Sequence, residues 1–141
     1  ANEFGNAYVR ESPIKKKLFP FTIKTLNYLK NQYSLHIITN GFEEVQHIKL
    51  KNCDLVKYFT HIITSEKVGV KKPNRKIFEY ALKKANTSPK ESIMIGDDLK
   101  VDIIGAQNLK IKSIYFNPKK NKIREKNITQ ISCLSELIKI L

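Results

Sequence analysis

The feature that most constrains the fold of this chain is a regular alternation of short apolar runs with segments of helical spacing. Each of the apolar runs has the length and composition of a buried strand. They span residues 35–39, 61–65, 92–96 and 112–116. Because strands that alternate with helices build βαβ units, this pattern predicts an α/β fold with a parallel sheet.

The segments between and after these runs carry apolar residues at helical spacing. A weaker amphipathic pattern near the beginning of the sequence predicts one more helix, which a basic linker over residues 14–18 joins to the rest. The predicted helices span residues 1–12, 20–31, 43–51, 76–85, 102–108 and 134–141.

The charge of the chain limits the partners it can have. Its 141 residues contain 26 Lys and Arg against 13 Asp and Glu, a formal net charge of +13. Such a balance attracts nucleic acid and other polyanions. However, the arginines are limited to Arg10, Arg75 and Arg124, and arginine is the residue that base-reading and bidentate phosphate sites favour. The composition therefore argues against a nucleic-acid partner. Residues 117–127 are rich in lysine and asparagine, and we expect them to form a polar, basic loop.

Other sequence features concern location. The apolar runs are far shorter than the ~20 residues that span a bilayer, so the sequence does not predict a membrane protein. Residues 1–5 lack the basic and then apolar pattern of a signal peptide. Cys53 and Cys133 have no CxxC spacing, and nothing supports a disulfide between them. We therefore expect two thiols in a reducing cytoplasm.

Polar residues follow the predicted strands at the edge where parallel sheets bind ligands, outside the carboxyl ends of the strands. The first cluster is Thr39, Asn40 and Gly41, whose hydroxyl, amide and backbone N–H can hold a phosphoryl oxygen. The same three residues also suit a plain turn with a helix cap. Taken alone, the cluster leaves both interpretations open.

The second candidate is Lys72, in the loop that precedes the helix predicted over residues 76–85. Because Pro73 follows, the backbone of Lys72 is expected to be extended, so that its ammonium can point toward the site. A lone lysine is more commonly a solvated surface residue, and this interpretation also stays open.

The third cluster is the acid pair Asp97 and Asp98, which comes directly after the buried run 92–96. Asp102 follows four residues after Asp98. Mg²⁺ is a natural partner for such carboxylates, because it is bound by one or two of them together with waters and substrate phosphate. The alternative is that Asp97 or Asp98 caps the next helix. The buried strand before the pair favours metal binding.

A phosphate-holding threonine, a cation and a metal-binding acid pair are the parts that phosphoryl transfer requires. Their order is also specific. The segments IITNG, VGVKKPNRKIFEYAL and IMIGDDLKVDIIGAQN resemble the second, third and fourth motifs of the haloacid dehalogenase (HAD) superfamily. The resemblance covers residues 17–141 and extends to the branch that contains small cytoplasmic phosphatases and nucleotidases. It implies a three-layer, Rossmann-like core.

The resemblance also implies a role for each cluster. Thr39, Asn40 and Gly41 would hold the phosphoryl group, and Lys72 would neutralise the charge of nucleophile and phosphate. Asp97 would bind Mg²⁺, with Asp98 as a possible further ligand. Asp102 would act indirectly, by anchoring its loop or Lys72.

One part of the family pattern is missing from this sequence. The family's chemistry starts with an aspartate nucleophile in a DxDxT motif after an early strand, and the sequence contains no DxD. Residues 1–18 instead resemble the last helix of an inserted helical cap and its return to the core. The expected organisation is therefore a cap remnant over residues 1–18 and a partial HAD-like core over residues 19–141.

The resemblance places the missing strand between the strands that end at Thr39 and Gly96, whose inner edges would otherwise be unpaired. We expect these two strands to pair directly, or to accept a strand from a second copy in a strand-exchanged oligomer or from a complementing chain.

Two functions from different classes follow. The first is a Mg²⁺-dependent phosphomonoester hydrolase in the complete form of the protein, acting on a small phosphorylated metabolite or nucleotide. The alternative is a catalytically inactive fragment or pseudoenzyme that acts in binding or assembly, because covalent catalysis needs the nucleophile.

Overall fold

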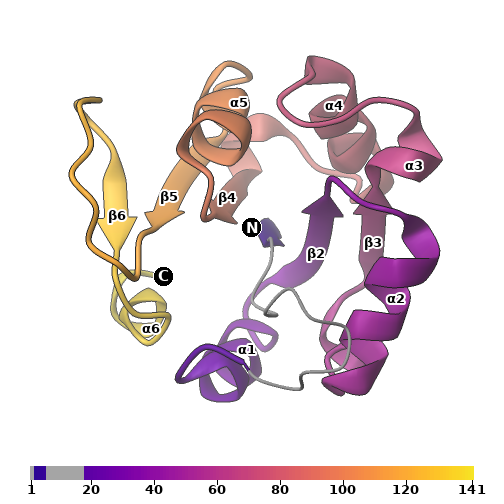
Figure 1. The fold of residues 1–141 in the computed structure, drawn as a ribbon, viewed down its shortest axis with the longest axis horizontal. Coiled ribbons are helices and arrows are strands. Elements are labelled where there is room, and N and C mark those ends of the chain that lie inside the picture. The colour runs from indigo at the N-terminus through magenta and orange to yellow at the C-terminus, as the bar shows by residue number, and fades with distance from the viewer. Residues whose placement is uncertain (1, 6–17) are drawn as a thin grey trace.

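The computed structural model describes residues 2–5 and 18–141, and within them the fold is built on one sheet of parallel strands (Figure 1). The strand order is β3-β2-β1-β4-β5-β6. The strands are β1 (Asn2–Gly5), β2 (Ser34–Thr39), β3 (His61–Thr64), β4 (Ser92–Gly96), β5 (Lys112–Phe116) and β6 (Thr129–Ile131).

Helices cover both faces of this sheet, which makes three layers. The α-helices are α1 (Thr22–Leu29), α2 (Glu43–Asn52), α3 (Ser65–Val68), α4 (Arg75–Lys84), α5 (Gly105–Gln107) and α6 (Glu136–Ile140). A π-helical segment, Leu99–Ile104, leads into α5, and short 3₁₀ turns lie at Val56–Tyr58 and Pro89–Glu91. Figure 1 shows α1 and α6 on one side of the sheet and α4 and α5 on the other.

The hydrophobic core is divided by the sheet into two clusters. Leu26 of α1 and Leu137 of α6 belong to the first cluster, together with Ile95 of β4. Phe78 of α4 belongs to the second, together with Met94 of β4. Neighbouring residues of one strand thus face opposite layers, as the period of two in a β-strand requires. A strand buried on both faces reads as a continuous apolar run, which is the signal that the sequence gives here.

The structure confirms the predicted fold class and the four predicted strands, which appear as β2, β3, β4 and β5. The sequence missed β6, a three-residue edge strand in which Ile131 is buried but Thr129 and Gln130 are exposed. So short a strand carries no periodic signal. Over the described residues, no helix is long and apolar enough to cross a membrane.

The largest correction concerns β1. Residues 2–5 were predicted to be helical, but they form the central strand, with Gly5 opposite both Ile37 of β2 and Ile95 of β4. The expectation that β2 and β4 pair directly, or accept a strand from another chain, is therefore wrong for this structure. The physical reason is that a strand between two others is held by backbone hydrogen bonds, so a polar segment of low strand propensity can occupy the place. The rest of the predicted helix and of the cap remnant, residues 6–17, lies outside the described residues.

Candidate functional site

The register of the sheet places the cluster at Thr39 and the acid pair at Asp97 at the same edge of the sheet. Ile37 and Ile95 lie opposite the same residue of β1, so Thr39 and Asp97, each two residues further along its strand, reach the same carboxyl edge. Thr64 of β3 lies directly opposite Thr39. The sequence predicted these residues at the carboxyl ends of parallel strands, and the register places the two strand ends at the same edge.

Lys72 lies below this edge and is buried, with 3% of its surface exposed. Its Nζ donates to Oδ1 of Asp102 at 2.5 Å and to the backbone carbonyl of Ile38 at 3.0 Å. Asp102 is fully buried as well. Burial lowers the pKa of Lys72, and the neighbouring Asp102 opposes that shift. The solvated-surface interpretation of Lys72 is therefore wrong.

The side chain of Asn40 fixes the backbone of Lys72. Its Oδ1 accepts the Lys72 N–H at 2.7 Å, and its Nδ2 donates to the Lys72 carbonyl at 3.0 Å. The Lys72–Pro73 peptide is cis. Both polar atoms of this amide are engaged in positioning the lysine, a role that the sequence did not predict for Asn40.

Asp102 also connects the lysine to the loop that begins with the acid pair. Its Oδ2 accepts the backbone N–H of Asp98 at 3.2 Å, while Oδ1 binds Lys72. Gly96 makes room for this carboxylate, because a Cβ at that position would lie 2.6 Å from Cγ of Asp102. The expected anchoring role of Asp102 thus has a direct structural counterpart.

The two acids after β4 differ in what they do. Asp98 caps the π-helical segment, since its Oδ1 accepts the N–H of Val101 at 2.9 Å. The capping interpretation therefore holds for Asp98, although a second carboxylate oxygen remains to it. Asp97 is exposed at the surface, but partial desolvation and repulsion from Asp102 raise the pKa of its carboxyl. A cation next to Asp97 would relieve that repulsion.

The donor set fits Mg²⁺ better than a metal held entirely by protein. In the part of the chain that the structure describes, no group of three or more His, Cys, Asp and Glu side chains is arranged to hold a metal ion. Mg²⁺ does not require one, because it keeps several waters and is bound through one or two carboxylates and substrate phosphate. Asp97 and the second oxygen of Asp98 match that requirement.

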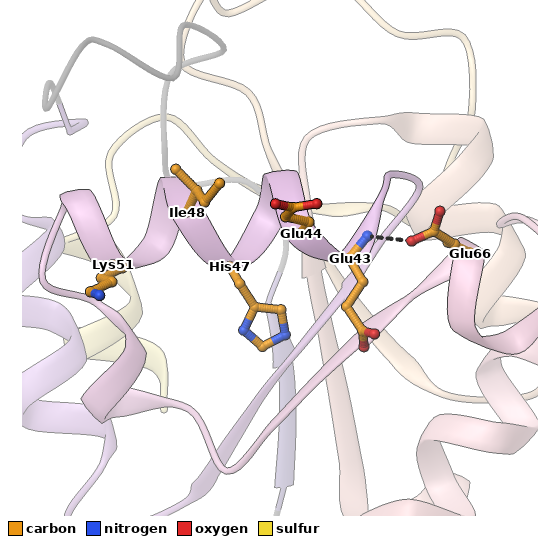
Figure 2. A pocket seen from close by; sticks show the side chains of 6 residues that line it. All are labelled: Glu43, Glu44, His47, Ile48, Lys51 and Glu66. Atoms are coloured by element: carbon orange, nitrogen blue, oxygen red, sulfur yellow. Dashed lines mark hydrogen bonds between the residues drawn. The ribbon is translucent and has the colours of Figure 1, made fainter.

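Thr39, Asn40 and Gly41, the residues predicted to bind phosphate, lead into α2. The first turn of α2 is capped by a side chain from another helix. Figure 2 shows Glu66 of α3 accepting the backbone N–H of Glu43, at 3.0 Å. Phe42, the residue before the helix, makes no side-chain capping bond. The sequence missed Glu66, because a cap supplied by another helix leaves no local signal.

A groove of about 410 Å³ runs along α2, and Figure 2 shows the side chains of the helix that line it. Its lining consists of Glu43, Glu44, His47, Ile48, Lys51 and Glu66. None of the predicted site residues lines this groove. The candidate site is therefore the carboxyl edge around Lys72, not the groove.

Comparison with known proteins agrees with this geometry. Residues 4–116 match the family model of haloacid dehalogenase-like hydrolases. The chain is 40% identical over 109 residues to a glyceraldehyde 3-phosphate phosphatase from Pyrococcus furiosus, covering 77% of this chain and 43% of that protein. It is 38% identical over 99 residues to the pyrimidine 5′-nucleotidase YjjG from Escherichia coli, covering 70% of this chain and 44% of that protein.

A solved structure supports the same likeness. The HAD-hydrolase YfnB from Bacillus subtilis, bound to magnesium, superimposes with a TM-score of 0.82 at 29% identity, over 91% of this chain and 56% of that one. The chain spans less than half the length of the two relatives described above.

Proposed function

Because the chain belongs to the haloacid dehalogenase-like hydrolase family, we propose that its complete form is a Mg²⁺-dependent hydrolase of small phosphomonoesters. The substrate is a phosphorylated metabolite or a nucleotide, as it is for the phosphatase and nucleotidase relatives. The observation that carries this proposal is the buried Lys72–Asp102 pair, held beneath the edge where Thr39 and Asp97 meet.

In this proposal the residues of the edge divide the work of binding a phosphoryl group. The Thr39 hydroxyl and the backbone N–H groups of Asn40 and Gly41 donate to its oxygens. Lys72, fixed by three partners, supplies a positive charge that does not have to reorganise when the substrate binds. Asp102 keeps that ammonium in place and does not touch the substrate.

Asp97 and Asp98 would hold the Mg²⁺. When bound there, the ion neutralises phosphate charge and polarises a phosphoryl oxygen. That the similar YfnB was solved bound to magnesium supports Mg²⁺ as the ion.

The alternative function is binding or assembly without catalysis, and one observation favours it. The central strand β1 is followed in sequence by Asn6 and Ala7, so no carboxylate follows directly at the place where the family resemblance expects the nucleophile. A site without that acid binds phosphate and metal but forms no aspartyl phosphate.

An oligomer or a complementing chain remains a prediction, but the exchange of a strand is no longer the reason for it. The sheet needs no extra strand, because β1 lies between β2 and β4. A complementing chain would instead have to supply the acid. Sedimentation equilibrium of the chain, alone and with a longer family member, tests this prediction. We also propose a cytoplasmic location, on the ground of the two cysteine thiols.

The test of the proposed function is hydrolysis of phenyl phosphate by the complete form of the protein, with and without Mg²⁺. We expect Mg²⁺-dependent turnover that falls at least about 100-fold in Asp97→Asn. Asp54→Asn is the matched control, because Asp54 is an exposed acid whose partner is Lys57. Binding of Mg²⁺ and phosphate without turnover would support the inactive alternative. Turnover equal in both variants would overturn the assigned site.

A further inference from the structure

We infer that a pocket at the carboxyl ends of β5 and β6 is an anion subsite that takes a second acidic group of the substrate. This inference rests on the proposed function for its substrate. The pocket has a volume of about 540 Å³. Its lining consists of Asn117, Lys120, Asn121, Lys122, Ile123, Gln130, Ile131, Ser132 and Glu136.

The pocket opens at the same edge of the sheet as the candidate site. Gly96 of β4 lies opposite Tyr115 of β5, and Phe116 lies opposite Ile131 of β6. The residue after Gly96 is Asp97, which therefore lies level with this row. Because neighbouring strands are about 4.8 Å apart, β6 lies about 10 Å from β4. A small molecule with two separated acidic groups can span that distance.

The wall of the pocket is a built turn. Asn117 is buried, with 4% of its surface exposed. Its Nδ2 donates to the Asn121 carbonyl at 2.9 Å and to Oε1 of Gln130 at 3.0 Å, while its Oδ1 accepts the Asn121 N–H at 3.0 Å. The N–H of Lys120 closes the turn on the Asn117 carbonyl at 3.1 Å. The backbone of Lys120 is therefore held within this turn, and Lys122 follows directly after the bonded Asn121.

The pocket carries two lysines, Lys120 and Lys122, against one acid, Glu136. The ion pairs of the described residues involve Lys57, Lys72 and Arg75, so Lys120 and Lys122 have no carboxylate within ion-pair distance. Both lysines are exposed. Ammonium groups in this state are available to an anion.

The acid in the lining, Glu136, is already engaged. Its Oε2 accepts the backbone N–H groups of Ser132 at 2.8 Å and Cys133 at 2.9 Å, and also contacts the Ser132 hydroxyl at 3.3 Å. These backbone hydrogen bonds lower the pKa of Glu136. Its carboxylate is therefore bonded at the start of α6 and forms no ion pair with the two lysines of the lining.

The size of the pocket favours a small ligand over a nucleic acid. Its volume lies in the range of small-molecule sites. Its cations are lysines, which bind phosphate as point charges, whereas nucleic-acid readers favour arginine. The substrate class is therefore a doubly anionic one, such as a nucleotide or a sugar bisphosphate.

The test is calorimetric titration of the full chain with inorganic pyrophosphate in Mg²⁺-free buffer. We expect the double variant Lys120→Gln/Lys122→Gln to bind at least about tenfold more weakly, because charge-assisted hydrogen bonds are lost. The matched control is Lys90→Gln/Lys112→Gln, which removes the same charge from exposed lysines at the amino ends of β4 and β5. The control is expected to bind as the wild type does.

Three outcomes would overturn the inference. They are no pyrophosphate binding by the wild type, equal weakening in both variants, and an RNA oligonucleotide that binds more tightly than pyrophosphate and is lost with Lys120 and Lys122. Failure of the proposed function is seen separately. If phenyl phosphate is not hydrolysed but the pocket variant still loses pyrophosphate, the subsite is supported and the hydrolase is not.

Discussion

Lys72 and the lysines of the loop over residues 117–127 differ in their burial and in their bonding partners. Lys72 is buried and bonded to Asp102, to the Ile38 carbonyl and, through its backbone, to Asn40. The lysines of the 117–127 loop are exposed, and none of them is in the ion pairs of the described residues. The comparison teaches that, among the described residues, the same residue type serves both as a buried charge held by partners and as an exposed charge open to solvent.

A buried charge and an exposed charge differ in the free energy of desolvation that folding requires. A buried ion is expensive to desolvate, and partners in exact geometry are needed to offset that cost. An exposed ion keeps its hydration and contributes little to stability, but it attracts anions from solution. Stability measurements therefore separate the two groups more sharply than activity measurements do.

Removal of the buried cation is the strongest way to test this comparison. We expect Lys72→Met to reduce the free energy of unfolding by about 3–5 kcal/mol, because Asp102 is left as an uncompensated buried charge. Urea denaturation followed by circular dichroism measures the loss.

The double variant Lys72→Met/Asp102→Leu is the control for this prediction. Because it removes both charges, it is expected to recover most of the stability, although Asp98 loses the acceptor of its N–H. A double variant no more stable than Lys72→Met would show that packing, not charge, is lost.

His36 is a second buried ionisable residue, and its burial makes the stability of the fold depend on pH. His36 is 1% exposed and stacks on His61, with ring centroids 5.3 Å apart. Burial, and then the charge of His61, lowers the pKa of His36 from 6.5 to about 4. Between these values the unfolded chain binds the proton and the folded chain does not, so stability falls as the pH drops from 6.5 to 4.

The expected loss over that interval is about 3 kcal/mol, since one pKa unit corresponds to about 1.4 kcal/mol. Urea denaturation at pH 4 and pH 6.5 measures it. His36→Phe, which keeps an aromatic ring in the stack, should lose correspondingly less than the wild type. His47→Gln, at an exposed position of α2, should follow the wild type. A wild-type and a His36→Phe curve with the same pH dependence would contradict the assignment.

The sequence predicted most of the fold because the informative strands are buried on both faces. The runs 35–39 and 92–96 are mostly apolar, and they appear as β2 and β4 with changes of at most one residue at their ends. The failure at β1 has the opposite cause. Asn2–Gly5 has no such pattern, and the backbone hydrogen bonds of its two neighbours decide its conformation. Long-range pairing of this kind leaves no trace in a local sequence.

The candidate site was predictable as a set of residues but not as a set of contacts. Strand ends identified Thr39 and Asp97, since parallel strands end at one edge. The engagement of both polar atoms of Asn40 by the Lys72 backbone was not predictable, because that contact joins residues 32 positions apart. Glu66, which accepts a hydrogen bond across 23 positions, was missed for the same reason.

A smaller loss of stability is expected from a substitution at Gly96, which lies against the carboxylate of the buried Lys72–Asp102 pair. In Gly96→Ala the new methyl group would lie 2.6 Å from Cγ of Asp102, a carboxylate that Lys72 holds in place. We expect a loss of about 1–3 kcal/mol, the usual cost of overpacking a core. Thermal unfolding measures it, with Gly41→Ala as the control, because the nearest atoms there belong to the flexible end of Gln46. Equal losses in the two variants would show that Asp102 moves aside freely.

The smallest effect is expected for the exposed lysines, and its sign is informative. Lys119→Gln/Lys126→Gln lowers the net charge from +13 to +11, because 13 − 2 = 11. Neither lysine has an ion-pair partner among the described residues, so the change in unfolding free energy should stay within about 0.5 kcal/mol. Because like charges repel in the folded chain, the change should be a slight gain at low salt that disappears when salt screens the repulsion. Urea denaturation at two salt concentrations measures it. A loss above about 1 kcal/mol would mean that these lysines, like Lys72, hold the structure together, and the contrast between the two groups would fail.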